Sequence, residues 1–159
     1  MGLLGRWFDR KKYAAYPFAP YISSERSEEI QKAMLQEQRA GGDCMNVLRH
    51  RYGILYIEPK GAASTDPVAD GLTRKITAAF RRAAPSGIGS CGVHVCICGS
   101  VSSAIEHILP QGIFTNALCI HYMAFHRSEV PQKMLETVAA FTTGEAEPSV
   151  KELQQPRIG

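Results

Sequence analysis

Cysteine and histidine residues are concentrated in one stretch of this sequence, between Cys91 and His126. Four of the five cysteines and four of the five histidines lie within it. Thiolates and imidazoles are the side chains that bind zinc and other borderline metals, and a thiol beside an imidazole can also form a nucleophile and its base near neutral pH. We therefore expect the chemistry of the protein to lie in this stretch.

The first group of donors is predicted to lie on a strand. Residues 91–98 are rich in β-branched side chains and lie between glycines, a pattern typical of strands. Because side chains alternate along a strand, His94, Cys96 and Cys98 should share one face. Neighbouring members of that face are separated by roughly 6.6 Å, so two of them can bind one metal ion only where the strand bends, as at Gly99, or bulges.

A helix predicted over 117–127 carries the remaining donors. Cys119 and His126 are seven residues apart and lie on nearly the same face of such a helix, whereas His121 and His126 are five apart and lie on different faces. We therefore predict a tetrahedral zinc site with four ligands, which are Cys96, Cys98, Cys119 and His126. His94 or His121 is the alternative to one of these. The spacing matches none of the paired Cys-x-x-Cys zinc signatures and leaves open whether the metal is structural or catalytic.

A thiol enzyme centred on Cys98 is a second chemistry that these residues allow. If residues 101–109 form a helix, Cys98 lies at its N-terminus, where backbone amides and the helix dipole favour the thiolate. His94 or His121 would then act as the base or orient the thiol. The sequence contains no phosphate-binding cysteine loop, serine nucleophile elbow, Walker loop, dinucleotide fingerprint or HExxH motif.

The first 22 residues form an arm rich in aromatic side chains. It contains 6 of the 13 aromatic residues, and Pro17 and Pro20 argue against a continuous helix. An arm of this composition is expected to dock, either on its own domain or on a protein partner or a second copy of the chain. In the latter case the protein is an assembly or interaction module, and its cysteines are ordinary buried residues of the core.

The rest of the sequence predicts one globular domain over residues 23–142, of α/β or α+β class. Its small mixed sheet is expected from 52–58, 91–98 and a hairpin over 104–115. Its helices are expected at 24–40, 66–84, 117–127 and 131–142. In the hairpin, Pro110 and Gly112 suit a tight turn followed by a glycine bulge, and a helix over 101–109 is the rival prediction. Residues 143–159 lack a core pattern and are predicted to be a flexible tail.

The overall composition is that of an ordinary globular protein, with 45% hydrophobic and 21% charged residues. The net charge of +3 provides no dense basic face, which argues against a nucleic-acid partner. No apolar run approaches the roughly 18 residues that span a bilayer, and the N-terminal residues lack the apolar segment of a signal peptide. We therefore predict a cytoplasmic protein with no membrane association, whose cysteines are free thiols, metal ligands or catalytic groups.

Overall fold

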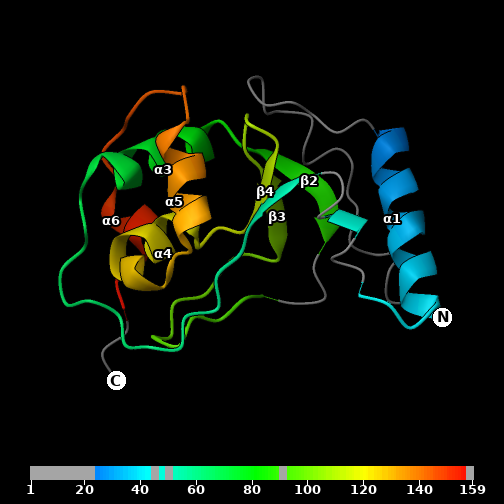
Figure 1. Ribbon diagram of the computed structural model, residues 1–159, viewed down its shortest axis with the longest axis horizontal. Helices are drawn as coiled ribbons and strands as arrows, with labels where there is room; N and C mark the ends of the chain where they lie inside the picture. Colours follow the sequence, from blue (N-terminus) through cyan, green and yellow to red (C-terminus); the bar gives the residue numbers. More distant parts are fainter. Residues whose placement is uncertain (1–23, 44–46, 49–51, 90–92, 157–159) are drawn as a thin grey trace.

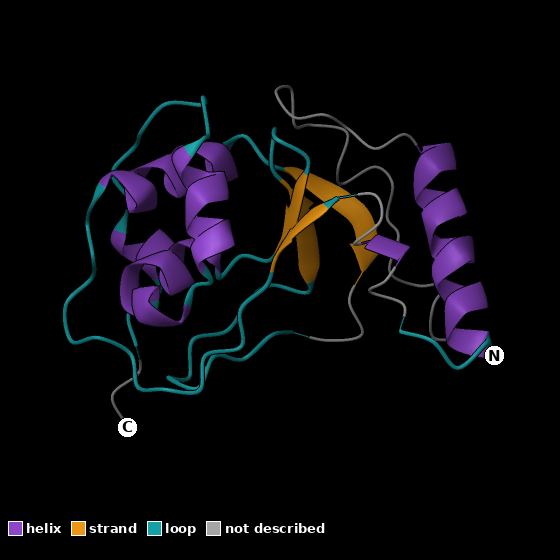
Figure 2. Ribbon diagram, in the orientation of Figure 1, coloured by secondary structure: helices purple, strands orange, loops and turns teal. Residues whose placement is uncertain are grey.

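The centre of the molecule is a four-stranded mixed sheet with helices on both sides (Figures 1 and 2). The structure is a computed structural model that describes residues 24–43, 47–48, 52–89 and 93–156. One helix lies on one side of the sheet, and a group of helices lies on the other. This arrangement confirms the predicted mixed α/β or α+β class. The predicted aromatic arm, residues 1–22, lies outside the described residues.

The strand order in the sheet is β1-β4-β3-β2. The strands are β1 (Gly53–Leu55), β2 (Ala84–Gly89), β3 (Ile105–Ile108) and β4 (Ile113–Thr115). β3 and β4 pair antiparallel, β1 is parallel to β4, and β2 is antiparallel to β3. β1 and β2 therefore run in the same direction at opposite edges, and the β3–β4 hairpin lies between them.

The hairpin has the turn that its proline and glycine predict. The backbone N–H of Gly112 donates to the carbonyl of Leu109 at 2.9 Å, and Gly112 has a φ of +74°. Glycine adopts this left-handed conformation without the steric cost that a β-carbon brings. The rival prediction of a helix over 101–109 is wrong, because 105–108 pair as β3.

The fourth strand of the sheet differs from the predicted one. Residues 84–89 form β2, whereas the described part of 91–98 makes an isolated bridge between Val95 and Val101 and otherwise forms a loop. β2 is an edge strand with a register irregularity after Pro85, and edge positions tolerate a residue that lacks a backbone N–H. Pro85, which follows the predicted helix 66–84, is therefore compatible with a strand in this position.

The predicted helices are present with shorter bounds. They are α1 (Ser24–Arg39), α3 (Gly71–Arg81), α4 (Cys119–Phe125) and α5 (Gln132–Ala139). α3 begins at Gly71 and not at residue 66 because the Asp70 carboxylate accepts the N–H groups of Leu72 and Thr73, both at 3.1 Å. A single 3-10 turn, η2 (Arg127–Glu129), follows α4. Among the described residues, no helix combines the length and apolar character that crossing a membrane requires.

Each side of the sheet has its own hydrophobic core. The side that faces α1 buries Ile30, Ile108 and Phe114. The larger core lies against α3, α4 and α5, and includes Ile76 and Met123. Residues 143–156, which have no core pattern of their own, nevertheless contain a further helix, α6 (Val150–Leu153), and its Leu153 packs against this larger core. The domain boundary at residue 142 stays a prediction.

Candidate metal centre

Cys96 and Cys98 lie on a tight turn of the loop 93–102. The N–H of Cys96 donates to the carbonyl of Ser100, and the N–H of Gly99 donates to the carbonyl of Cys96, each at 2.8 Å. Gly99 has a φ of +86°, which glycine adopts more readily than any other residue. The chain therefore bends where a straight strand would hold the two thiols roughly 6.6 Å apart.

Side chains in this loop alternate between exposed and buried, as predicted for a strand, although the segment does not form a strand. Val93, Val95 and Ile97 are 50%, 64% and 61% exposed, whereas Cys96 is buried and Cys98 is partly buried. The two cysteines therefore point inward together, toward the group of helices.

The two histidines come from opposite ends of α4. His121 lies in its first turn, but α4 ends at Phe125, and His126 has φ −126° and ψ 31°, outside the helical region. In a continuous helix His121 and His126, five residues apart, would lie on different faces. Because His126 lies outside the helix, this restriction does not hold here. The change of direction at His126 turns its imidazole toward the same point as that of His121.

Four ligand atoms converge at this point. The Sγ atoms of Cys96 and Cys98 and one ring nitrogen each of His121 and His126 all lie within 4.8 Å of one another. Cys96 Sγ is 3.1 Å from Nε2 of His126, and Cys98 Sγ is 3.2 Å from Nε2 of His121. A tetrahedral zinc ion, with bonds of about 2.3 Å to sulfur and 2.0–2.1 Å to nitrogen, holds its donor atoms roughly 3.3–3.8 Å apart. This Cys2His2 cluster is therefore close enough to bind a metal ion.

The second nitrogen of each imidazole faces an oxygen atom. Nδ1 of His121 donates to the carbonyl of Leu153 at 3.0 Å. Nδ1 of His126 lies 3.5 Å from Oε2 of Glu129. The Glu129 carboxylate is itself held by the backbone N–H groups of residues 60 and 61, at 2.7 and 3.1 Å. The hydrogen bond of His121 orients its imidazole and leaves its Nε2 lone pair free for the metal. Nδ1 of His126 has no hydrogen-bond partner among the described residues, and the Glu129 carboxylate is the polar group that faces it.

Burial sets the protonation of Cys96, His121 and His126 in the absence of metal. Burial lowers the pKa of His121 and of His126, so both imidazoles are neutral near pH 7, which is the ligating form. Burial raises the pKa of the Cys96 thiol to about 11. A bound cation has the opposite effect on a thiol and deprotonates it.

Cys119, one of the four predicted ligands, lies apart from the cluster. It is buried in the larger core, where burial raises the pKa of its thiol to about 12. The fourth donor beside Cys96, Cys98 and His126 is instead His121, the alternative that the helical-face argument had ranked lower. That argument assumed a helix extending to residue 127, and α4 ends two residues earlier.

His94, the other alternative ligand, belongs to a separate polar group. Its Nε2 is 3.3 Å from Oε1 of Glu106, and its ring lies against that of Tyr56, with centroids 5.1 Å apart. The Tyr56 hydroxyl donates to the second oxygen of Glu106. The buried Glu106 carboxylate therefore has a partner on each oxygen, and this pairing directs His94 away from the four converging donors.

The carbonyl of Leu153 is the contact that sequence reasoning missed. A backbone oxygen carries no signature in the sequence, and the segment around it lacks a core pattern.

Comparisons with protein-family models, curated proteins and solved structures give no match to this chain. The assignment of the site therefore depends on the geometry of its own residues.

Proposed function

We propose that this protein binds one zinc ion through Cys96, Cys98, His121 and His126, and that the metal has a structural role. The observation that carries the proposal is the convergence of two thiols and two imidazoles within 4.8 Å. Two sulfur and two nitrogen donors are a ligand set that zinc takes in structural sites. The metal would join the loop 93–102 to α4, which are otherwise separate in the sequence.

Charge balance supports a divalent ion with affinity for sulfur. Cys96, His121 and His126 are 3%, 0% and 2% exposed, so an unbalanced charge among them would be costly. Two thiolates and two neutral imidazoles with a divalent cation sum to zero charge. Thiolate ligands favour zinc over magnesium or calcium, which prefer oxygen.

The number of ligands favours a structural over a catalytic zinc ion. Catalytic zinc sites keep one position open for water or substrate, whereas four protein donors fill the tetrahedral shell. The four side chains here supply those donors without a carboxylate or water, and three of the four are buried.

A thiol enzyme is the second candidate, because one contact favours it. The 3.2 Å approach of Cys98 to Nε2 of His121, with Nδ1 held by a backbone carbonyl, resembles a nucleophile and its oriented base. Two features weigh against it. Burial lowers the pKa of His121 and so disfavours the imidazolium that would stabilise a thiolate. Residues 101–109 also form no helix that would place its N-terminus at Cys98.

Metal analysis tests the proposal directly. The full chain, purified without chelator, should carry about one equivalent of zinc by elemental analysis. Replacing zinc with cobalt should give the thiolate charge-transfer bands and strong d–d absorption of tetrahedral cobalt. The double variant Cys96→Ser/Cys98→Ser should retain less than about a tenth of an equivalent.

Cys119→Ala is the matched control, because Cys119 is a neighbouring cysteine outside the cluster. This variant should keep its zinc and its cobalt spectrum. A wild-type chain that carries no transition metal would refute the proposal, and loss of zinc from folded Cys119→Ala would refute the ligand set. The predictions of a cytoplasmic location and of a partner or second copy bound through residues 1–22 stay open to experiment.

A further inference from the structure

The segment 149–154, which we name the C-terminal strap, is hydrogen-bonded to both halves of the metal centre. Its Leu153 carbonyl accepts from Nδ1 of His121 at 3.0 Å, and its Gln154 carbonyl accepts from the Ser100 hydroxyl at 2.9 Å. The Ser100 hydroxyl also lies 3.4 Å from Sγ of Cys98. The strap therefore contacts one ligand from α4 directly and the cysteine turn through a single side chain.

The backbone of the strap has an unusual conformation where it meets the centre. Gln154 has φ 46° and ψ 69°, in the left-handed region that residues other than glycine rarely adopt. Such a conformation persists where surrounding contacts impose it, and it is a common feature of functional sites. Here the two hydrogen bonds at consecutive carbonyls supply those contacts.

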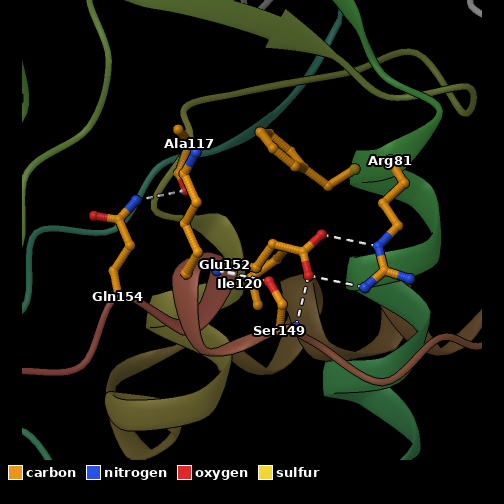
Figure 3. A pocket seen from close by; sticks show the side chains of 8 residues that line it. Arg81, Ala117, Ile120, Ser149, Glu152 and Gln154 are labelled. Carbon is orange, nitrogen blue, oxygen red and sulfur yellow. Dashed lines mark hydrogen bonds and ion pairs between the residues drawn. The ribbon is translucent and has the colours of Figure 1, made fainter.

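Glu152, the residue before Leu153 in the strap, forms an ion pair that does not touch the ligands. Glu152 accepts from Nε and Nη2 of Arg81 on α3, both at 2.8 Å, in a bidentate arrangement (Figure 3). The Ser149 hydroxyl accepts the N–H of Glu152, and the Glu152 carboxylate accepts the N–H of Ser149. Arg81 also donates to the carbonyl of Glu147 at 2.8 Å. Glu152 thus fixes both the single turn of α6 and its position on α3.

The strap is only partly buried, since residues 149–151 are exposed and residues 152–154 are half-buried. A pocket of about 470 Å³ lies beside the strap and is lined by Phe80, Ile120, Lys151 and Glu152 among others. Figure 3 shows it from close by. A helix of four residues has no stability of its own. A segment held by a few polar contacts and one apolar side chain, Leu153, can open locally without unfolding the rest of the domain.

We infer that the strap controls how fast the centre releases its metal, an inference that rests on the proposed zinc site. With the strap docked, His121 is held with Nε2 on the metal and the turn carrying Cys98 is tied to the same segment. When the strap detaches, His121 loses the partner of its Nδ1 and the centre opens to solvent. Arg81 and Glu152 are then positioning residues, which act on the metal through the strap.

The release rate of zinc into excess chromophoric chelator tests this inference on the full zinc-loaded chain. Glu152→Gln should release zinc about tenfold faster than wild type, the lower end of the usual effect of removing outer-shell support. Glu145→Gln is the matched control. Its ion pair with Arg74, also 2.8 Å, joins the same helix α3 to the segment before the strap but reaches no ligand. This control should release zinc at the wild-type rate.

Two further variants separate positioning from general destabilisation. The double variant Arg81→Glu/Glu152→Arg restores the ion pair but not the contacts of Glu152 with Ser149 and of Arg81 with the Glu147 carbonyl. It should therefore release zinc more slowly than either single variant, Arg81→Glu or Glu152→Arg, without reaching the wild-type rate. Ser100→Ala removes the bond to the Gln154 carbonyl, together with the contact of the same hydroxyl with Sγ of Cys98, while leaving the ion pair intact, and should also accelerate release. The cobalt spectrum should be unchanged in Glu152→Gln and Glu145→Gln, because neither residue touches a ligand.

The possible results distinguish this inference from the proposed function. A wild-type chain without zinc removes the basis of both. A wild-type chain that holds zinc, with Glu152→Gln and Ser100→Ala releasing it as slowly as Glu145→Gln does, overturns the role of the strap and leaves the zinc site standing.

Discussion

The most informative perturbation outside the ligands is at Asp70, whose carboxylate has two separable roles. It accepts the N–H groups of Leu72 and Thr73 as the N-cap of α3. It also accepts Nη1 and Nη2 of Arg127 at 2.6 and 2.7 Å, while the same guanidinium donates to the Thr73 hydroxyl and the carbonyl of Met123. This contact ties the start of α3 to the residue that follows the ligand His126.

Two substitutions separate these roles. Asparagine caps a helix about as well as aspartate, so Asp70→Asn should lose only the ion pair. The Asp70 side chain is 45% exposed, so after solvent screening the pair is worth about 1 kcal/mol. Asp70→Ala loses the cap as well, which adds about 1 kcal/mol. The free energy of unfolding of the zinc-loaded chain should therefore fall by about 1 kcal/mol in the first variant and about 2 kcal/mol in the second.

The pH dependence of unfolding supplies an independent readout of the same pair. Hydrogen bonds from Arg127 hold the pKa of Asp70 well below its usual range. The pKa of Asp70 is lower in the folded than in the unfolded protein. The contribution of the Asp70–Arg127 pair to the free energy of unfolding is therefore fully present above the unfolded pKa of about 3.9, and it is lost as pH falls toward the folded pKa. The stability difference between wild type and Asp70→Asn should therefore narrow below about pH 4.

Urea unfolding followed by circular dichroism measures both quantities. Equal losses in Asp70→Asn and Asp70→Ala would show that the cap contributes nothing. A difference between wild type and Asp70→Asn that stays constant down to about pH 3 would refute the assignment of the low pKa to the Arg127 pair.

Other contacts lead to equally direct expectations. Glu129→Gln removes the carboxylate 3.5 Å from Nδ1 of His126 and should weaken zinc binding about tenfold in a competition titration. Glu136→Gln, at an exposed position on α5, should leave zinc affinity unchanged, and equal affinities of the two variants would contradict the role of Glu129. Removing zinc with a chelator should lower the thermal midpoint reversibly, by an amount equivalent to about 4 kcal/mol at free zinc about 1,000 times Kd; an unchanged midpoint would argue against a structural metal. Gly112→Ala should cost about 1 kcal/mol in urea unfolding through its φ of +74° alone, because nothing lies within 4 Å of the added β-carbon. Gly112→Asn should cost less, and the reverse order would contradict the argument.

The features that the sequence by itself determined are the local ones. Hydrophobic periodicity located α1, α3, α4 and α5, because a helix of this length must bury one stripe of side chains. Pro110 and Gly112 indicated the hairpin turn, because proline restricts φ to a value that suits the start of a turn and glycine permits the positive φ needed at its end. The concentration of thiols and imidazoles located the candidate site to one stretch of the chain.

Tertiary structure alone decided which donors meet. Whether 84–89 or 91–98 supplied the edge strand depended on pairing with β3, which no local pattern encodes. Once 93–102 became a loop, the turn at Gly99 was able to bring Cys96 and Cys98 together. The choice of His121 over Cys119 depended on α4 ending at Phe125. The residue that follows His126, Arg127, donates to the Met123 carbonyl of α4 and pairs with Asp70, 57 residues away in the sequence. Contacts of this kind have no local signature, and for that reason the spacing of the donors predicted where the site lies better than which residues form it.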